Sequence, residues 1–348
     1  MNHSISQPSQ PFAPNRQLLH GPNGRKWLAW RVVAVALFIS LGISAPAESG
    51  EKPLHKVRAG YVSPSTDNIL LPIAQKRGFL QKHGIEVEII ALRGGVQMAQ
   101  ALLSDSLQFA QMAGSVVVRS HLAGGDLVMV AGFVNRISYL MVSRRDINTM
   151  KDLVGKKIAT ASIGGSVDSV LRLGLKASGI DPQSATLLPA GPPQSRIAAL
   201  ASAQMDATIV PPENLGAVER SGLKILKDLS EVDVQIQHTG LVVRRSLIKE
   251  NRSLVKSFLA AIVEAIHFYR NNERETIQIM ATFSGTNEPR PLKDSYDFHK
   301  KLFPQPPYPS AEGFKTLLSE IRDPGVDAKK ISPEIFFDRT LLDELKAR

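Results

Sequence analysis

Cysteine is absent from all 348 residues of the sequence. Its absence excludes disulfide bonds, thiolate metal sites, a cysteine nucleophile and an N-terminal cysteine that carries a lipid. The nucleotide-binding patterns G-x-G-x-x-G and G-x-x-x-x-G-K-[ST], the zinc pattern H-E-x-x-H and the hydrolase pattern G-x-S-x-G are also missing. We therefore expect no cofactor, no metal site and no serine hydrolase chemistry.

Long hydrophobic runs are scarce as well. The segment VVAVALFISLGI, residues 32–43, follows three basic side chains within 25–31 and precedes the small residues APA at 45–47. A basic region, a short apolar core and an A-x-A exit predict a secretory signal peptide, so residues 1–47 are interpreted as a disordered N-terminus and a cleaved signal. The apolar run is shorter than the about 20 residues of a membrane span. A signal that stays uncleaved as a membrane anchor is the alternative.

The charge balance shows no block of one sign. Lys and Arg number 42 against 32 Asp and Glu, for a net charge of +10. Removal of residues 1–47 takes away four basic residues and no acidic ones, which leaves a mild positive charge. Because the basic residues are spread along the chain without interleaved aromatics, nucleic acid is not an expected partner. A weak preference for anionic ligands is compatible with the charge.

From residue 55 onward, short apolar segments alternate with amphipathic ones. Strands are expected at 55–62, 85–92, 107–112 and 126–133, each followed by helical spacing. The same order starts again at residue 156. This alternation predicts an α/β fold with mixed, mostly parallel sheets.

The two halves also resemble one another in sequence. At an offset of 98 residues, ALLSDSLQFAQMAGS at 101–115 lies over ALASAQMDATIVPPE at 199–213. The shared order of helix, strand, turn, helix and strand predicts two α/β lobes of similar build. The strong helical pattern at 252–272 and the segments after it have too few strands for a third domain, so we expect them to fold back onto the first lobe.

Turn residues gather where the predicted strands end. The carboxyl ends of parallel strands meet at one edge of a sheet, where helix N-termini also present unpaired N–H groups. Two lobes that face one another would line a cleft with such loops, among them SPSTDN at 63–68 and SIGGS at 162–166. In the second loop Ser166 and Asp168 are candidates to cap a helix, or to contact a ligand together with Gly165. Both interpretations stay open.

Four segments together resemble one protein family. They are GYVSPSTDNILLPIAQKRGFLQKHGIEVEII, RGGVQMAQALLSDSLQFAQMAGSVVV, INTMKDLVGKKIATASIGGSVDSVLRLGLKASGIDP and AALASAQMDATIVPPENLGAVERSGLKIL. The chain is similar over roughly residues 55–270 to the solute-binding proteins of ABC importers for nitrate, sulfonates and taurine, the SsuA/NMT1-like family, which also includes thiamine-precursor binders. The resemblance implies the two-lobed type II periplasmic binding protein fold, with lobe 1 at 54–138 plus 235–348, lobe 2 at 139–234, and crossing hinge strands near 135–140 and 234–240.

The resemblance also implies a set of ligand-binding residues in the loops at the cleft. They are Ser63, Thr66, Asn68, Gly95, Ser115, Arg136, Gly165, Ser166, Asp168 and Glu213. Arg136 has the alternative of a surface or hinge ion pair, and Glu213 that of a solvated carboxylate at a helix start. A carboxylate near the cleft departs from a simple oxyanion site, so a ligand with N–H or cationic character is an equal alternative to an anionic, carboxylate, sulfonate or pyrimidine-like one. Tyr139 could stack on a ring or only pack, and His238 is isolated in sequence.

The expected function is non-enzymatic: a monomeric periplasmic protein captures a small molecule between its lobes and delivers it to an ABC permease in the cytoplasmic membrane. An enzyme on the same fold is the main alternative, with Asp168 and Glu213 as its candidate acid–base groups. A binding protein that feeds a sensor or a tripartite carrier is the third.

Overall fold

The computed structural model describes residues 54–92, 94–321 and 325–346. The predicted signal segment at 1–47 lies outside the described residues. Among those that are described, no helix is long and apolar enough to cross a membrane.

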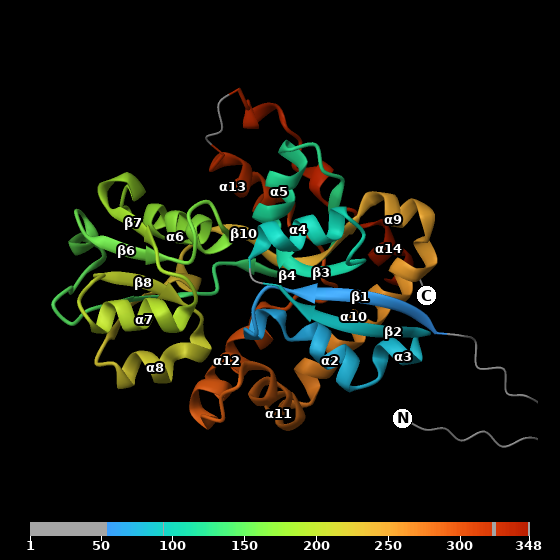
Figure 1. The fold of residues 1–348 in the computed structure, drawn as a ribbon, viewed down its shortest axis with the longest axis horizontal. Coiled ribbons are helices and arrows are strands. Elements are labelled where there is room, and N and C mark those ends of the chain that lie inside the picture. The colour runs from blue at the N-terminus through green and yellow to red at the C-terminus, as the bar shows by residue number, and fades with distance from the viewer. Residues whose placement is uncertain (1–53, 93, 322–324, 347–348) are drawn as a thin grey trace, which may run out of the picture. The chain divides into compact units, whose positions relative to one another are not determined.

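Two five-stranded sheets organise the unit from Lys52 to Arg348 (Figure 1). The first has the order β2-β1-β3-β10-β4 and the second β7-β6-β8-β5-β9. In the first sheet the strands are β1 (His55–Tyr61), β2 (Ile85–Ala91), β3 (Phe109–Ala113), β4 (Leu127–Arg136) and β10 (Gln235–Arg244). In the second they are β5 (Leu140–Ser143), β6 (Lys157–Thr160), β7 (Thr186–Pro189), β8 (Ala207–Val210) and β9 (Lys224–Asp228).

The pairing in each sheet is mixed, as the sequence predicted. Strand β1 runs parallel to β2 and β3, and β6 runs parallel to β7 and β8. The antiparallel strands are β10, between β3 and β4, and β5, between β8 and β9. The chain leaves the first sheet after Arg136, enters the second at Leu140 and returns at Gln235. The segment that returns to the first sheet therefore lies just before residue 235, slightly earlier than the crossing expected near 234–240.

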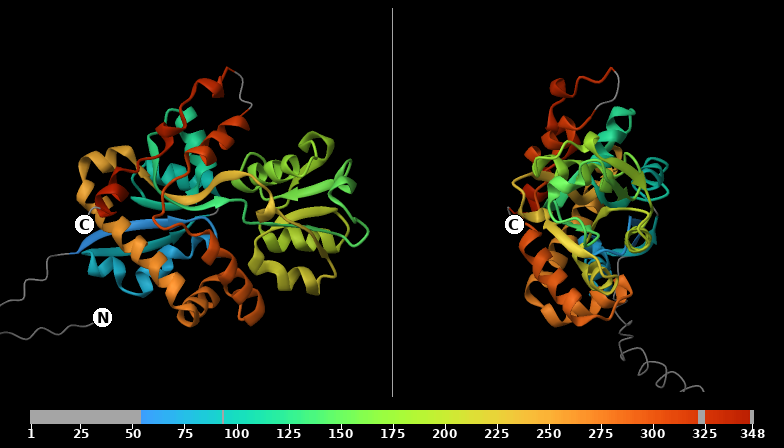
Figure 2. Two further views of the ribbon diagram at one scale, coloured as in Figure 1. Left: turned by 180° about the vertical axis from the view of Figure 1, so that it is seen from behind. Right: turned by 90° about the vertical axis from the view of Figure 1, so that its left-hand side faces the viewer.

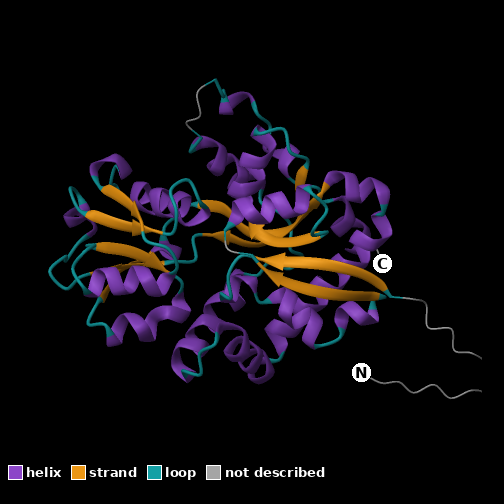
Figure 3. Ribbon diagram, viewed as in Figure 1, coloured by secondary structure: helices purple, strands orange, loops and turns teal. Residues whose placement is uncertain are grey.

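Helices cover both faces of the strands (Figure 3). In the first half the helices are α2 (Leu70–Lys76), α3 (Phe79–Lys82), α4 (Gly95–Leu103) and α5 (Gly114–Leu122), with the 3₁₀ turn η1 (Thr66–Asn68) before them. The second half has α6 (Ser166–Ala177), α7 (Pro193–Ala201), the 3₁₀ turn η4 (Pro212–Asn214) and α8 (Leu215–Arg220). The remaining helices are α9 (Arg245–Glu250), α10 (Arg252–Asn271), α11 (Glu273–Ser284), α12 (Pro289–Leu302), α13 (Ala311–Ser319) and α14 (Thr340–Lys346).

The predicted repeat is visible in the helix bounds. Helix α4 starts at residue 95 and α7 at residue 193, an offset of 98, and both have nine residues. The same offset carries the start of α5 at Gly114 onto the start of η4 at Pro212. The two halves therefore share one order of elements, and Ser115 and Glu213 take equivalent places in it.

The C-terminal helices pack on the first sheet, as expected. One hydrophobic cluster joins α2, α10 and α12 to β1, β3 and β4, with Phe109 of β3 stacked on Phe258 of α10 at a ring-centroid distance of 3.7 Å. On the other face, α13 joins α4 and α5 in a second cluster that continues into the second sheet. The views in Figure 2 show the long α10 along the first sheet.

Two glycines let helices approach the returning strand β10 at Gln237. A Cβ atom on Gly114 of α5 would lie 2.6 Å from the backbone oxygen of Gln237. On Gly313 of α13, it would lie 2.8 Å from the carbonyl carbon of Ile236 and closer still to the backbone nitrogen of Gln237. Both approaches are closer than a side chain allows, so the absence of Cβ atoms fixes this strand next to His238.

Candidate functional site

Buried polar side chains from distant parts of the chain meet beside η1. Asp67 is 8% exposed, His238 of β10 is 3% exposed and His299 of α12 is 2% exposed. Glu213 of η4 and Ser295 of α12 complete the group. These residues are called the central cluster below. Because they come from the turns η1 and η4, the return strand β10 and helix α12, the cluster lies where these parts of the chain converge.

Glu213 is the residue of the second half that enters the central cluster. The backbone N–H of Thr66 donates to its Oε1 at 3.2 Å, and the hydroxyl of Ser295 lies 3.3 Å from its Oε2. The Ser295 hydroxyl is also 2.8 Å from Oγ1 of Thr66. The carboxylate is therefore held by donors of the first half.

Asp67 is the second carboxylate of the cluster. Its Oδ1 accepts hydrogen bonds from the hydroxyl of Ser65 and, at 3.3 Å, from the side-chain amide of Asn68. Its Oδ2 lies 3.4 Å from Nε2 of His238. Burial by itself would raise the pKa of Asp67, but the contacts with His238 and Ser65 outweigh it and lower the pKa. Asp67 is therefore the ionised member of the pair.

Glu213 has the opposite shift. Burial, together with repulsion from Asp67, raises the pKa of Glu213 to about 7, despite its hydrogen bonds with Thr66 and Ser295. Two nearby carboxylates cannot both ionise at ordinary cost, and Glu213, which lacks a contact like that of Asp67 with His238, keeps its proton longer. Glu213 therefore changes charge close to neutral pH.

The rings of Tyr139 and His299 favour their neutral forms, and the buried guanidinium of Arg196 is held mainly by backbone carbonyls. The ring of Tyr139 meets His238 edge to face at 5.4 Å, and burial raises the pKa of Tyr139. Burial lowers the pKa of His299, whose Nδ1 lies 2.9 Å from the carbonyl oxygen of Ser295. Arg196 of α7, 1% exposed, donates to the carbonyls of Gly191 and Ile209 and to Thr208, and its burial lowers its pKa to about 10.

Several buried polar atoms near the cluster have no hydrogen-bond partner among the described residues. They are Oδ1 of Asn68, Nε2 of Gln111, Nε2 of His238 and Oγ1 of Thr239. Unpaired buried polar groups cost free energy unless another molecule satisfies them. These atoms are therefore candidates for contact with a bound molecule or water.

Of the predicted residues, Thr66, Asn68 and Glu213 belong to this site. Ser63 is near it, since its hydroxyl lies 2.9 Å from that of Ser65. The prediction that the loop 63–68 and the segment of Glu213 share one site agrees with these contacts.

Gly165, Ser166 and Asp168 instead form their own turn and helix start. Gly164 has a φ of +73°, and Gly165 is the N-cap of α6 without a side-chain cap bond, so the expected cap by Ser166 is wrong. Asp168 accepts the N–H of Gly164 at 3.1 Å and pairs with Arg172 at 3.0 Å. The tight turn, which Asp168 stabilises, accounts for Gly164, and a ligand contact by Gly165, Ser166 or Asp168 stays a prediction.

We expect Asp168→Ala to lower the free energy of unfolding by about 1 kcal/mol, the usual loss for a carboxylate at a helix start, and to leave solute affinity unchanged. Urea unfolding and calorimetric titration test both parts. A loss of affinity without a loss of stability would return Asp168 to the binding site.

The other predicted residues lie at helix starts or on the surface. Gly95 begins α4, and a Cβ there would strike the side chain of Val116. Ser115 is 9% exposed in the first turn of α5. Arg136 is exposed at the end of β4. Their contribution to binding stays a prediction.

Sequence analysis missed Asp67, Ser295 and His299 as site residues and set aside His238. Asp67 stood inside the loop SPSTDN, between residues that were selected, and His238 stood in the expected crossing segment. Ser295 and His299 lie in a region that was expected only to complete the first lobe. None of the four belongs to a local motif.

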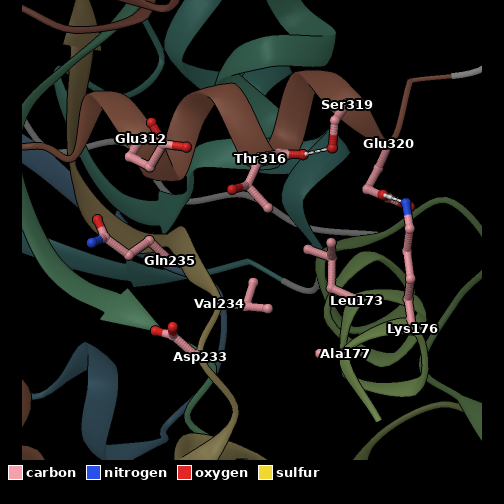
Figure 4. Close-up of a pocket in the computed structure, with 10 residues that line it drawn as sticks. All are labelled: Leu173, Lys176, Ala177, Asp233, Val234, Gln235, Glu312, Thr316, Ser319 and Glu320. Atoms are coloured by element: carbon pink, nitrogen blue, oxygen red, sulfur yellow. Dashed lines mark hydrogen bonds and ion pairs between the residues drawn. The ribbon is translucent and has the colours of Figure 1, made fainter. Parts of the chain in front are cut away.

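Two cavities lie elsewhere among the described elements, and neither is lined by a residue of the central cluster. One, of about 310 Å³, lies between α8 and α12, and its lining includes Leu215 and Asp294, close in sequence to Glu213 and Ser295. The other, of about 450 Å³, lies between α6, the start of β10 and α13, where Lys176 and Glu320 pair at 2.9 Å (Figure 4). Among the described residues, no group of three or more His, Asp or Glu side chains could hold a metal ion.

The family model described as NMT1/THI5 like matches residues 65–276, more than half of the chain. The chain belongs to the NMT1/THI5-like family. This confirms the resemblance that the sequence segments indicated. A protein of Brucella abortus named as a binding protein is 27% identical over 234 residues, which cover 65% of this chain and 71% of the relative.

Solved structures place this NMT1/THI5-like chain in the two-lobed fold. The periplasmic aliphatic sulphonate binding protein SsuA from Escherichia coli has a TM-score of 0.63 and 22% identity, covering 76% of this chain and 90% of SsuA. The periplasmic nitrate-binding protein NrtA from Synechocystis PCC 6803 has a TM-score of 0.66 and 18% identity, covering 84% and 89%. The α/β fold of periplasmic binding proteins, predicted from the sequence, is confirmed.

Proposed function

We propose that this protein is an extracytoplasmic solute-binding protein that captures a small molecule between its lobes and delivers it to an ABC importer. The contact of Glu213 with Thr66 and Ser295 carries the proposal, because it joins polar groups of both halves in one buried site. Relatives named as binding proteins support a binding role. SsuA and NrtA, with the same fold, are named for sulphonate and nitrate.

The proposal includes two lobes, 54–138 plus 235–348 and 139–234, that close around the solute. Domain closure about crossing strands is a common mode of solute capture, because it removes the ligand from water and lets both lobes contact it. The closed, loaded monomer would dock on a permease of the cytoplasmic membrane. A signal peptide at residues 1–47 would bring the protein to the periplasm.

The role is proposed as binding without turnover. The main alternative, an enzyme on the same fold, would use the Asp67–His238 pair as an acid–base couple in place of the earlier candidate Asp168. The two roles differ in the fate of the solute. A binding protein returns it unchanged, whereas an enzyme releases a product.

Native mass spectrometry of freshly purified protein tests the proposal. We expect an added mass of a small molecule that is lost after unfolding and refolding, and that rebinds with one-to-one stoichiometry in calorimetric titration. The recovered solute should have the same mass after long incubation with the protein. A changed solute would support the enzyme, and no binding of any molecule from a broad library of small solutes would contradict the proposal.

A further inference from the structure

The central cluster has more hydrogen-bond acceptors than donors around its two carboxylates. The hydroxyl of Ser295 and the N–H of Thr66 already serve Glu213. The amide nitrogen of Asn68 already serves Asp67 and Ser65, while its Oδ1, on a side chain 3% exposed, has no partner among the described residues. A molecule that enters this site therefore meets two carboxylates and the free amide oxygen of Asn68, with the amide nitrogen of Gln111 as a free donor.

The negative charge of the two carboxylates also favours a ligand that donates hydrogen bonds. An oxyanion placed beside Asp67 and Glu213 would face like charges in a site with little water, where repulsion is weakly screened. A group with positively charged N–H donors would instead pair with both carboxylates and satisfy the amide oxygen of Asn68. Specificity often depends on the groups that a site penalises, and here the penalised group is a bare anion.

The cavity between α8 and α12 is lined by charged side chains of both signs. Its arginines are paired, Arg220 with Glu288 at 2.6 Å and Arg290 with Asp294 at 3.8 Å. Glu219, which also lines it, has no ion pair among the described residues. The charged side chains that line this cavity therefore sum to one negative charge.

We propose that the captured solute carries a protonated nitrogen, such as an ammonium or amidinium group, and that Glu213 is the residue that selects for it, with Asp67 and Asn68 as its further acceptors. This inference rests on the proposed function. It distinguishes the protein from the relatives that are named for sulphonate and nitrate.

The inference implies a pH dependence. The ionisable groups around Glu213 are Asp67 of η1 and the rings of Tyr139 and Tyr269, whereas His238 of β10 and His299 of α12 lie around Asp67. A cation binds best when Glu213 is ionised, so its affinity should rise from pH 6 to pH 8. The part of the rise that Glu213→Gln abolishes is the part due to Glu213.

Isosteric probes test the inference. Three sets are compared by thermal shift and calorimetric titration: acetamidine, acetamide and acetate; benzamidine, benzamide and benzoate; taurine and ethanesulfonate. We expect the member with the protonated nitrogen to bind best in at least one set. Glu213→Gln should weaken that probe by about 10- to 100-fold, the usual loss for a charged hydrogen bond, and change the neutral amide by less than about threefold. Glu231→Gln, at an exposed carboxylate, should bind like the wild type.

The outcomes separate the two proposals. Equal or stronger binding of the anionic member, or no binding of any probe with a protonated nitrogen, overturns the inference, and so does an unchanged affinity in Glu213→Gln. Binding of anions without conversion would leave the solute-binding function standing. Failure of the whole solute library, together with no co-purified molecule, would refute the proposed function itself.

Discussion

Glu213→Gln should raise the free energy of unfolding by about 3 kcal/mol at pH 8 and leave it almost unchanged at pH 4. The pKa of Glu213 is raised from 4.5 to about 7 in the folded protein, and each unit of pKa corresponds to about 1.4 kcal/mol. A raised folded pKa gives stability that is fully present below the unfolded value and is lost as pH rises through the folded value. Because glutamine stays neutral at every pH, the variant does not lose this stability.

Comparison of the wild type with Glu213→Gln separates the effect of Glu213 on stability from the effects of its neighbours. The lowered pKa of Asp67 gives stability that is lost as pH falls through its folded value. The lowered pKa of His299 gives stability above pH 6.5 that is lost as pH falls through its folded value. Both effects occur in the wild type and in the variant, so they largely cancel in the difference.

Urea unfolding between pH 4 and pH 8 measures this difference. Both tryptophans, Trp27 and Trp30, lie outside the described residues, so circular dichroism is the appropriate probe. Glu231→Gln removes one exposed carboxylate and should follow the wild type within about 0.5 kcal/mol. If the curve of Glu213→Gln is parallel to that of the wild type at every pH, Glu213 ionises as an ordinary surface carboxylate.

The fold could be predicted because its signals are local and repeated. Strand and helix periodicity alternated in the sequence, and the offset of 98 residues carried over to the bounds of α4 and α7. The break between α2 and α3 is also local, since Gly78 adopts a φ of +70° there. Such features depend on neighbouring residues, which a single sequence shows directly.

The site could be predicted only in part, because its partners are far apart in the chain. Parallel-sheet geometry places Thr66 and Glu213 each at the carboxyl edge of its own sheet, and their loops were found on that ground. The hydroxyl of Ser295 reaches Thr66 across 229 residues, and no periodicity encodes that contact. His238 was set aside for the same reason, since its partner Asp67 is distant in sequence.

Gly313→Ala should lower the free energy of unfolding by about 2 kcal/mol, although alanine favours a helix by about 1 kcal/mol over glycine. The new Cβ would lie 2.8 Å from the carbonyl carbon of Ile236, which is backbone and cannot rotate away. Helix α13 would have to move off β10, and overpacking of this kind typically costs 1–3 kcal/mol. Because His238 follows Gln237 directly, the displacement should also weaken solute binding.

The second glycine at this strand makes the test sharper. Gly114→Ala approaches Gln237 from α5, with its Cβ 2.6 Å from the backbone oxygen. Changes that share one contact are not additive, so the double variant should lose less stability than the sum of the two single losses. Lys315→Ala, exposed on the same helix as Gly313, should change stability by less than about 0.5 kcal/mol. If urea unfolding shows the same stability for Gly313→Ala and Lys315→Ala, α13 does not hold the return strand, and His238 must be positioned by other contacts.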